Sequence, residues 1–240
     1  MAALLELANV MRNFSGLRAV ADVSFTVPEG SVFAVIGPNG AGKTTLFNLI
    51  AGVLRPDAGS ITFRGERIDR LRPDEVCRRG VGRTFQIVRP FPGLSVEDNV
   101  VVGALLREPD PLAAMRQAHE ILWRLDLFDK RRHLAGALTL PDRKRLEVAR
   151  ALATEPRLLL LDEVMAGLRP TETDHMVGIL RKLNSEGLTI VLIEHVMRAV
   201  MAVADRVLVL HHGAAIAEGT PEHVVRDPAV IESYLGAEAV

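Results

Sequence analysis

Hydrophobic positions along the chain follow two spacings, one typical of buried strands and one typical of helices. Near-continuous apolar runs occur in SVFAVIG (31–37), RLLLLDE (157–163), LTIVLIEH (188–195) and RVLVL (206–210). Such runs predict strands buried on both faces. Helical spacing follows the first three runs, at 43–51, at about 171–185 and up to residue 204. We therefore predict an α/β fold with a largely parallel sheet covered by helices on both faces.

Segments of different character precede and interrupt this alternation. Strand-like stretches lie at about 4–10, 20–27 and 59–65. From about 73 to 140 the spacing is mostly helical, with helix starts at Ser95 and Pro111 and a strand-like VGRTFQ at 81–86. We predict a single domain, 1–240. Residues 1–72 and 154–240 form its core, which includes an N-terminal antiparallel β subdomain, and about 73–153 form an inserted helical subdomain.

Composition and charge exclude several classes of function. Lys and Arg total 29 against 30 Asp and Glu, a formal net charge of −1, so no global basic field attracts nucleic acid. The basic runs at 130–133 and 143–145 are expected to be solvated faces. The longest apolar run, at 100–106, is too short to span a membrane. We expect a soluble chain that binds no nucleic acid and reaches a membrane only through a partner.

The segment GPNGAGKTT at 37–45 matches the phosphate-loop pattern G-x-x-x-x-G-K-[ST]. Its glycines let backbone N–H groups close around phosphate oxygens, Lys43 reaches the terminal phosphates, and Thr44 offers a hydroxyl to Mg²⁺. A chance glycine turn is the alternative, but a buried strand precedes the loop and a helix follows it. The predicted nucleotide-binding residues of the loop are Gly37, Pro38, Asn39, Gly40, Ala41, Gly42, Lys43, Thr44 and Thr45.

The run RLLLLDE ends in two adjacent carboxylates. Neighbouring strand residues point to opposite sides, so Asp162 and Glu163 can serve different purposes. Asp162 suits an outer-sphere Mg²⁺ contact, and Glu163 suits orienting or deprotonating an attacking water. A strand followed by two acids is common by itself. Downstream of a phosphate loop, however, it favours a hydrolytic site.

Two further polar residues follow strand-like segments. His195 comes just after an apolar strand, where an imidazole can contact the terminal phosphate and the water; a polar cap of the next helix is the alternative. Gln86 ends VGRTFQ, where its amide can touch Mg²⁺, although taken alone it is a surface glutamine. The predicted Mg²⁺ contacts are therefore Thr44, Gln86 and Asp162.

The order of these motifs resembles that of the ATPase subunit of an ATP-binding-cassette (ABC) transporter, over essentially the whole chain. The segments GPNGAGKTTLFNLIAG, GRTFQ, LEVARALA, LLLLDEVMAGLRPTE, LIEHVM and GTPEHVVRDPAVIESYLG are similar to those of the branched-chain amino acid importer ATPases. The resemblance implies a P-loop NTPase core, ATP and Mg²⁺ as ligands, and Lys43, Glu163 and His195 as catalytic residues.

The resemblance also assigns roles to three further residues. Phe14 is implied to stack on adenine, with a buried strand phenylalanine as the alternative. Gln86 is implied to be the family's glutamine at the Mg²⁺ site. Thr139 is implied to offer its hydroxyl, from a helix N-terminus, to the γ-phosphate held by the phosphate loop of a second subunit.

Three segments depart from the family pattern. The signature, commonly LSGGQ, reads LTLPD at 138–142; Val164 stands where proline is usual; and the D-loop, commonly SALD, reads AGLR at 166–169. Pro141 deletes one N–H, and Asp142 is expected to bring a negative charge toward phosphate. We therefore predict a weakened site in trans, and pairing with a different ATPase subunit that carries a fuller signature.

We interpret the chain as the ATPase of an ABC importer, bound peripherally to transmembrane permeases at the cytoplasmic face of the cell inner membrane. An extracytoplasmic solute-binding protein is an indirect partner, and the segment 86–94 transmits movement to the permease. The solute, branched-chain amino acids or related small polar solutes, rests on resemblance alone. A lipid or lipopolysaccharide exporter ATPase and a catalytically weak regulatory subunit are the alternatives; intact Glu163 and His195 argue against the second.

Overall fold

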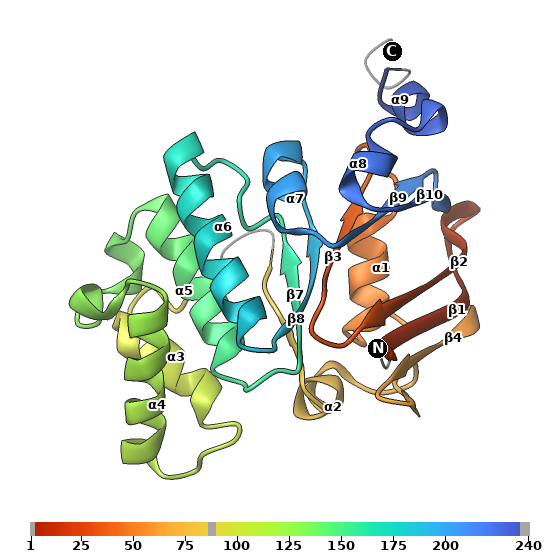
Figure 1. Ribbon diagram of the computed structural model, residues 1–240. Coiled ribbons are helices and arrows are strands. Elements are labelled where there is room, and N and C mark those ends of the chain that lie inside the picture. Colours follow the sequence, from red (N-terminus) through yellow and green to blue (C-terminus); the bar gives the residue numbers. More distant parts are fainter. Residues whose placement is uncertain (1–2, 86–89, 236–240) are drawn as a thin grey trace.

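The structure, a computed structural model, describes residues 3–85 and 90–235 (Figure 1). Within these residues a six-stranded sheet has the order β10-β9-β3-β8-β7-β6, and its pairs are parallel except β10 with β9. A four-stranded antiparallel sheet has the order β2-β1-β4-β5. The strands are β1 (Ala3–Phe14), β2 (Leu17–Pro28), β3 (Val32–Ile36), β4 (Ala58–Phe63), β5 (Glu66–Arg67), β6 (Val81–Arg83), β7 (Leu158–Asp162), β8 (Thr189–Ile193), β9 (Arg206–His211) and β10 (Ala214–Gly219).

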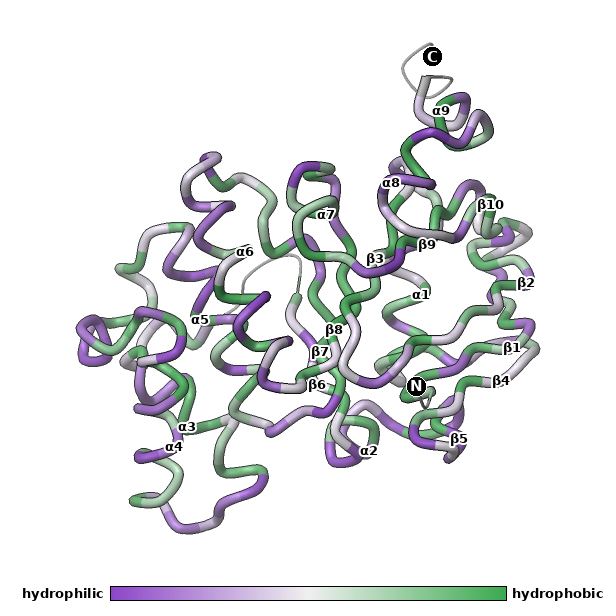
Figure 2. Tube along the Cα trace, viewed as in Figure 1, coloured by the Kyte–Doolittle hydropathy of each residue, from purple (hydrophilic) through white to green (hydrophobic). Residues whose placement is uncertain are grey.

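Alternate residues of the central strands enter two different hydrophobic cores, because successive side chains of a strand point to opposite faces. Ala34 and Leu159 pack with the helices on one face, whereas Phe33 and Leu160 pack with α1 and the antiparallel sheet on the other. Figure 2 shows the hydrophobic residues concentrated in β3, β7 and β8 at the middle of the molecule. The near-continuous apolar runs are therefore strands buried on both faces, as the sequence predicts.

Helices cover both faces of the central sheet (Figure 1). Helix α1 (Lys43–Ile50) lies between the two sheets, and α5 (Leu140–Leu152), α6 (Pro170–Ser185) and α7 (Met197–Val203) cover the opposite face. The other helical segments are α2 (Pro73–Arg78), α3 (Val96–Ala104), α4 (Pro111–Arg124), the 3₁₀ turns η1 (Phe128–Lys130) and η2 (Ala135–Ala137), α8 (Pro221–Val224) and α9 (Pro228–Leu235). Among the described residues, none of these helices combines the length and apolar character needed to cross a bilayer.

The predicted α/β fold is confirmed, with differences at its edges. Strands β1 and β2 extend well beyond 4–10 and 20–27, because a tight turn with Ser15 and Gly16 at positive φ lets Phe14 pair with Leu17. Strand β6 lies inside the range 73–153 but pairs with β7 of the central sheet. The boundaries of a helical subdomain stay a prediction.

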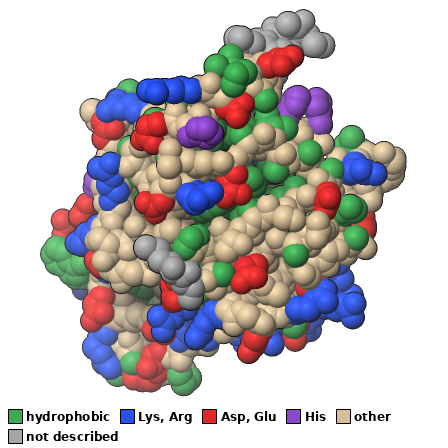
Figure 3. All heavy atoms as spheres, turned by 45° about the vertical axis from the view of Figure 1, so that its right-hand side comes forward, with side chains coloured by type: hydrophobic (Ala, Val, Ile, Leu, Met, Phe, Trp, Pro, Cys, Tyr) green, Lys and Arg blue, Asp and Glu red, His purple; other side chains and the backbone are tan. Residues whose placement is uncertain are grey.

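Charges on the face that carries the antiparallel sheet are mixed. Figure 3 turns the right-hand side of Figure 1 forward and shows acidic, basic and hydrophobic side chains interspersed over it. This distribution agrees with the formal net charge of −1.

Candidate active site

The loop between β3 and α1 packs so closely on neighbouring backbone that two of its positions require glycine. Gly37 and Gly42 have φ values of 145° and 100°. A Cβ on Gly37 would lie 2.0 Å from the carbonyl oxygen of Leu210, and one on Gly42 would lie 2.2 Å from that of Ala19. Any side chain there would force the backbone apart. The loop is therefore fixed between β9 on one side and β2 on the other.

Lys43, the first residue of α1, turns back over this loop. Its Nζ donates to the carbonyl oxygens of Gly37 and Pro38 at 2.7 and 2.9 Å. Burial lowers the pKa of Lys43, and the charges of Glu163 and Asp162 oppose that shift. A cation beside a glycine loop and a helix N-terminus forms a site for an anion such as a phosphate group.

A pocket of about 400 Å³ opens over the loop. Its lining consists of Phe14, Leu17, Arg18, Ala19, Asn39, Gly40, Ala41, Gly42, Lys43, Thr44, Thr45, Glu163 and His212. Phe14 is 38% exposed, and the Arg12 guanidinium lies 4.8 Å from its ring centroid. Phe14 is therefore not a core residue, and its ring borders the same space as the phosphate loop.

Asp162 ends β7 and is 1% exposed. Its Oδ2 accepts from Arg83 at 3.3 Å, but its Oδ1 has no hydrogen-bond partner among the described residues. Burial raises the pKa of Asp162, against the charge of Arg83. An unpaired buried carboxylate oxygen is a suitable ligand for Mg²⁺, which prefers oxygen atoms. Asp162, with Thr44 at the pocket, fits such an ion; Gln86, the third predicted ligand, lies outside the described residues.

Glu163 follows Asp162 and leaves the strand with a φ of 51°. This left-handed conformation costs a non-glycine residue about 1–2 kcal/mol. The Oε1 atom of Glu163 lies 2.5 Å from Nε2 of His195, which follows β8. The structure therefore brings together a carboxylate, an imidazole and, through Lys43, a cation. This arrangement can orient a water molecule and accept its proton.

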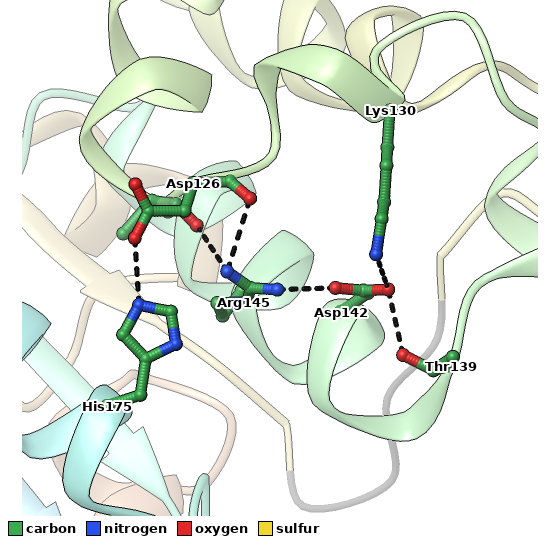
Figure 4. A network of polar contacts seen from close by, with 7 residues as sticks. Asp126, Lys130, Thr139, Asp142, Arg145 and His175 are labelled. Carbon is green, nitrogen blue, oxygen red and sulfur yellow. Dashed lines mark hydrogen bonds and ion pairs between the residues drawn. The ribbon is translucent and has the colours of Figure 1, made fainter. Parts of the chain in front are cut away.

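The start of α5, which we call the signature start (residues 138–142), differs from the prediction. Asp142 is 2% exposed and points inward, with Lys130 Nζ and Arg145 each 2.5 Å from its carboxylate and the Thr139 hydroxyl donating to it at 2.8 Å (Figure 4). Burial pushes the pKa of Asp142 up, but these contacts outweigh burial and hold it below its ordinary value. The expectation that Asp142 turns its charge toward a phosphate is wrong, because two cations neutralise it inside the protein.

The same network ties the signature start to more distant segments. Arg145 also donates to the carbonyl oxygens of Leu125 and Asp126 at 3.2 Å, and the Asp126 carboxylate lies 2.8 Å from Nε2 of His175 in α6 (Figure 4). Pro141 borders a cavity of about 240 Å³ beside these groups. Lys130 therefore holds this helix start directly through Asp142. Asp126, which contacts His175, is linked to Asp142 through Arg145.

Sequence reasoning missed two buried charged residues next to Glu163. Lys144, placed in a solvated basic run, is 5% exposed, and Glu194, next to His195, is 1% exposed. The helical spacing does indicate that Lys144 is buried, because Lys144 lies four residues before the buried Val148 on the same face of α5. The sequence also indicates burial of Glu194, because Glu194 directly follows the apolar run of β8. No cluster of three metal-ligating side chains occurs among the described residues.

Two family models match this chain. The one described as ABC transporter matches residues 20–166, more than half of the sequence. The one described as branched-chain amino acid ATP-binding cassette transporter matches residues 216–240.

Individual known proteins are similar over nearly the full length. The chain is 40% identical to the high-affinity branched-chain amino acid transport ATP-binding protein BraF of Pseudomonas aeruginosa and 38% identical to LivG of Escherichia coli, covering 97% of this chain and 98% of each relative. A solved ATP-binding cassette of an ABC transporter in its ADP conformation has a TM-score of 0.90 at 32% identity, over 98% of this chain and 100% of that one. A dimeric cassette bound to ADP and Pi shares the fold, with a TM-score of 0.83 at 24% identity, over 90% and 98%.

Proposed function

The chain belongs to the ATP-binding subunits of ABC transporters, and from this premise we propose that it hydrolyses ATP to drive import of branched-chain amino acids or related small polar solutes. The arrangement of Lys43, Asp162, Glu163 and His195 around the phosphate loop supports the chemistry. The match at 216–240 and the names of the two relatives support the class of solute.

Nucleotide binding divides among three parts of the pocket. Residues 37–45 hold the phosphates, and Phe14 stacks on the adenine face. Mg²⁺ supplies charge neutralisation at the phosphates when it is bound. Asp162 Oδ1 and the Thr44 hydroxyl are the oxygen atoms that we assign to it, with Gln86 as the further ligand that the sequence predicts.

Hydrolysis transfers the γ-phosphoryl group of ATP to water and yields ADP and phosphate. Glu163 orients the water and accepts its proton. His195, which is hydrogen-bonded to Glu163 Oε1, holds the orientation of the Glu163 carboxylate and contacts the γ-phosphate. Lys43 exchanges its two loop carbonyls for phosphate oxygens and neutralises their charge.

ABC ATPase cassettes work as dimers with transmembrane permeases, and we propose that the second cassette here is a different chain with a fuller signature. The signature start then serves the phosphate held by that partner. Pro141 lacks an N–H, and Thr139 donates its hydroxyl proton to Asp142. Losing a charge-assisted donor costs about 1.5–3 kcal/mol, or roughly tenfold to a hundredfold in rate. The partner's site should therefore be the slower one.

The segment from Phe91 to Leu94 is our proposed contact for a permease helix. Phe91 is 43% and Leu94 39% exposed. The backbone of Phe91 is held by two hydrogen bonds to the Asn99 amide, at 2.8 and 3.0 Å, so its ring is presented from a fixed position. Residues 86–89 of the predicted coupling segment lie outside the described residues. This contact would hold the chain at the cytoplasmic face of the inner membrane, with a solute-binding protein acting on the other side.

The test is reconstitution of the complex purified through a tag on this chain. ATP should drive uptake of labelled leucine into proteoliposomes that contain the wild-type complex, and Glu163→Gln should abolish this uptake while the complex still assembles. A complex without permeases, or one that moves lipid and no amino acid, would contradict the proposed function. Charged substitutions at both Phe91 and Leu94 should stop transport and leave nucleotide binding intact; normal transport would place the contact elsewhere.

A further inference from the structure

The turn that carries Glu163, residues 163–166, is held in a strained conformation by groups from other elements. Glu163 itself has a positive φ, which a glutamate adopts only when its surroundings impose it. Its N–H donates to the carbonyl oxygen of Ile193 at 3.0 Å. Two buried charged side chains also contact its backbone, Lys144 from α5 and Glu194 from the end of β8.

Lys144 reaches the turn from α5. It is 5% exposed, and its Nζ donates to the backbone carbonyl oxygen of Glu163 at 2.8 Å. Burial lowers the pKa of Lys144, and the charge of Glu194 is the largest influence opposing that shift. Packing alone does not account for a lysine at this position. An apolar side chain of similar length would fill the same space without the cost of removing a charged group from water.

Glu194 reaches the same turn from the end of β8. It is 1% exposed, its Oε1 accepts from the Met165 N–H at 2.8 Å, and its Oε2 has no hydrogen-bond partner among the described residues. Lys144 and Glu194 therefore bind the backbone before and after Val164, and the charge of each opposes the pKa shift that burial causes in the other.

We propose that Lys144 and Glu194 are positioning residues that set the orientation of the Glu163 carboxylate for hydrolysis. This inference rests on the proposed function of Glu163. Helix α5 begins at the signature start, which serves the partner's phosphate, and one turn later it contacts the turn of this chain's own site. A single helix therefore touches both nucleotide sites, and Lys144 is its contact with the backbone of the catalytic Glu163.

The test is steady-state ATP hydrolysis by the purified complex with Lys144→Met, Lys144→Arg and, as a matched loss of an exposed lysine, Lys182→Met. Lys144→Met should lower kcat about tenfold or more and change the KM for ATP less than about twofold. Lys144→Arg, which retains a donor, should recover kcat to within about threefold of wild type, and Lys182→Met should equal wild type. A kcat for Lys144→Met within twofold of wild type, or an equal loss of ATP binding, would overturn the proposal.

Glu194 gives an independent test if Lys144→Met fails to fold. Glu194→Gln keeps an oxygen acceptor for Met165 and should retain at least half of kcat, whereas Glu194→Met removes the acceptor and should lower kcat about tenfold at unchanged KM. Equal rates in the two variants would refute the positioning role. Glu163→Gln separates the two proposals: rapid hydrolysis by it would refute the proposed function, whereas its inactivity beside a fully active Lys144→Met would refute this inference alone.

Discussion

The chain's own phosphate site and its signature start differ in how completely their buried charged groups are paired. In the first, one carboxylate oxygen of Asp162 has no hydrogen-bond partner among the described residues, and burial raises the pKa of Asp162 and lowers that of Lys43. In the second, Asp142 is saturated by Lys130, Arg145 and Thr139, and its pKa lies below its ordinary value. An incompletely paired site is ready for a ligand, whereas a fully paired one is a fixed structural element.

The degenerate signature is a structural anchor and does not repel phosphate. A carboxylate directed at a phosphate would repel it, but a carboxylate neutralised by two cations holds the helix start in place. What the signature start lacks is donors, because Pro141 has no N–H and the Thr139 hydroxyl donates to Asp142. The weakness that we expect in trans therefore comes from missing hydrogen bonds and not from repulsion.

The largest effect should come from the chain's own site. Glu163→Gln should lower ATP hydrolysis at least about 100-fold, because an amide cannot accept the proton of the attacking water. ATP binding should persist, measured by equilibrium dialysis with labelled ATP. Glu222→Gln, an exposed substitution distant in sequence, is the control and should hydrolyse at the wild-type rate. Hydrolysis near the wild-type rate by Glu163→Gln would show that Glu163 does not accept the proton, and that the chain's own site is not distinguished from the signature start by this chemistry.

The next effect should appear in stability at the signature start. Asp142→Ala leaves Arg145 and Lys130 without their buried counter-ion and should cost about 3 kcal/mol, which corresponds to a fall in Tm of roughly 6–12 °C. Calorimetry of the purified chain measures this change. Asp129→Ala removes an exposed carboxylate from the same region and should leave Tm within about 1–2 °C of wild type. Equal Tm values for the two variants would mean that Asp142 is not a structural anchor.

The two regions should also respond oppositely to pH. Burial raises the pKa of Glu194 from 4.5 to about 7, so its contribution to stability is fully present below pH 4.5 and is lost as pH rises to about 7. Glu194→Gln lacks this loss and should gain on the order of 3 kcal/mol over wild type between pH 4.5 and 8. Asp142 has a lowered pKa, so its contribution is present above pH 3.8 and is lost as pH falls further. Urea denaturation at several pH values checks both signs, and a constant difference between Glu194→Gln and wild type contradicts the first.

The smallest effect should come from the base end of the pocket. Phe14→Ala should raise the Kd for ATP about fivefold, because one exposed stacking contact is lost. GTP should lose affinity by the same factor, since an aromatic ring contacts only the face of the base. Competition titrations with both nucleotides measure this, with Val53→Ala as the exposed control. A loss confined to ATP would show that the pocket reads base edges.

Sequence predicted the chain's own site better than the signature start, for a physical reason. The phosphate loop and the Asp162-Glu163 pair belong to contiguous segments whose local pattern fixes both their conformation and their chemistry. The direction of Asp142 depends instead on Lys130, from a separate 3₁₀ turn, and on charge compensation that local spacing does not encode. The run RKR at 143–145 looks like one solvated face because its charges are adjacent in sequence, whereas helical spacing turns Lys144 away from Arg143 and Arg145.

The sequence pattern does not indicate β10, α8 and α9, which follow β9, for a related reason. Strand β10 reads AAIAEG and is only partly buried, so its apolar pattern is weak. Its pairing with β9 depends on the turn at His212 and Gly213, both of which have positive φ. Helices α8 and α9 are short, and each begins with a proline. Such elements form because the sheet is already present to receive them.

The central position of β3 governs when this molecule can acquire activity during its synthesis. Strand β3 pairs with β8 and β9, which the ribosome adds near the end of the chain. Because synthesis proceeds at about 5–20 residues per second, roughly 10–35 s pass between the synthesis of β3 and that of both strands with which it pairs. The antiparallel sheet is complete once β5 has emerged, so it can form first. Gly37 packs against Leu210, and nascent chains that stop before β9 are therefore expected to lack a phosphate loop able to hold ATP.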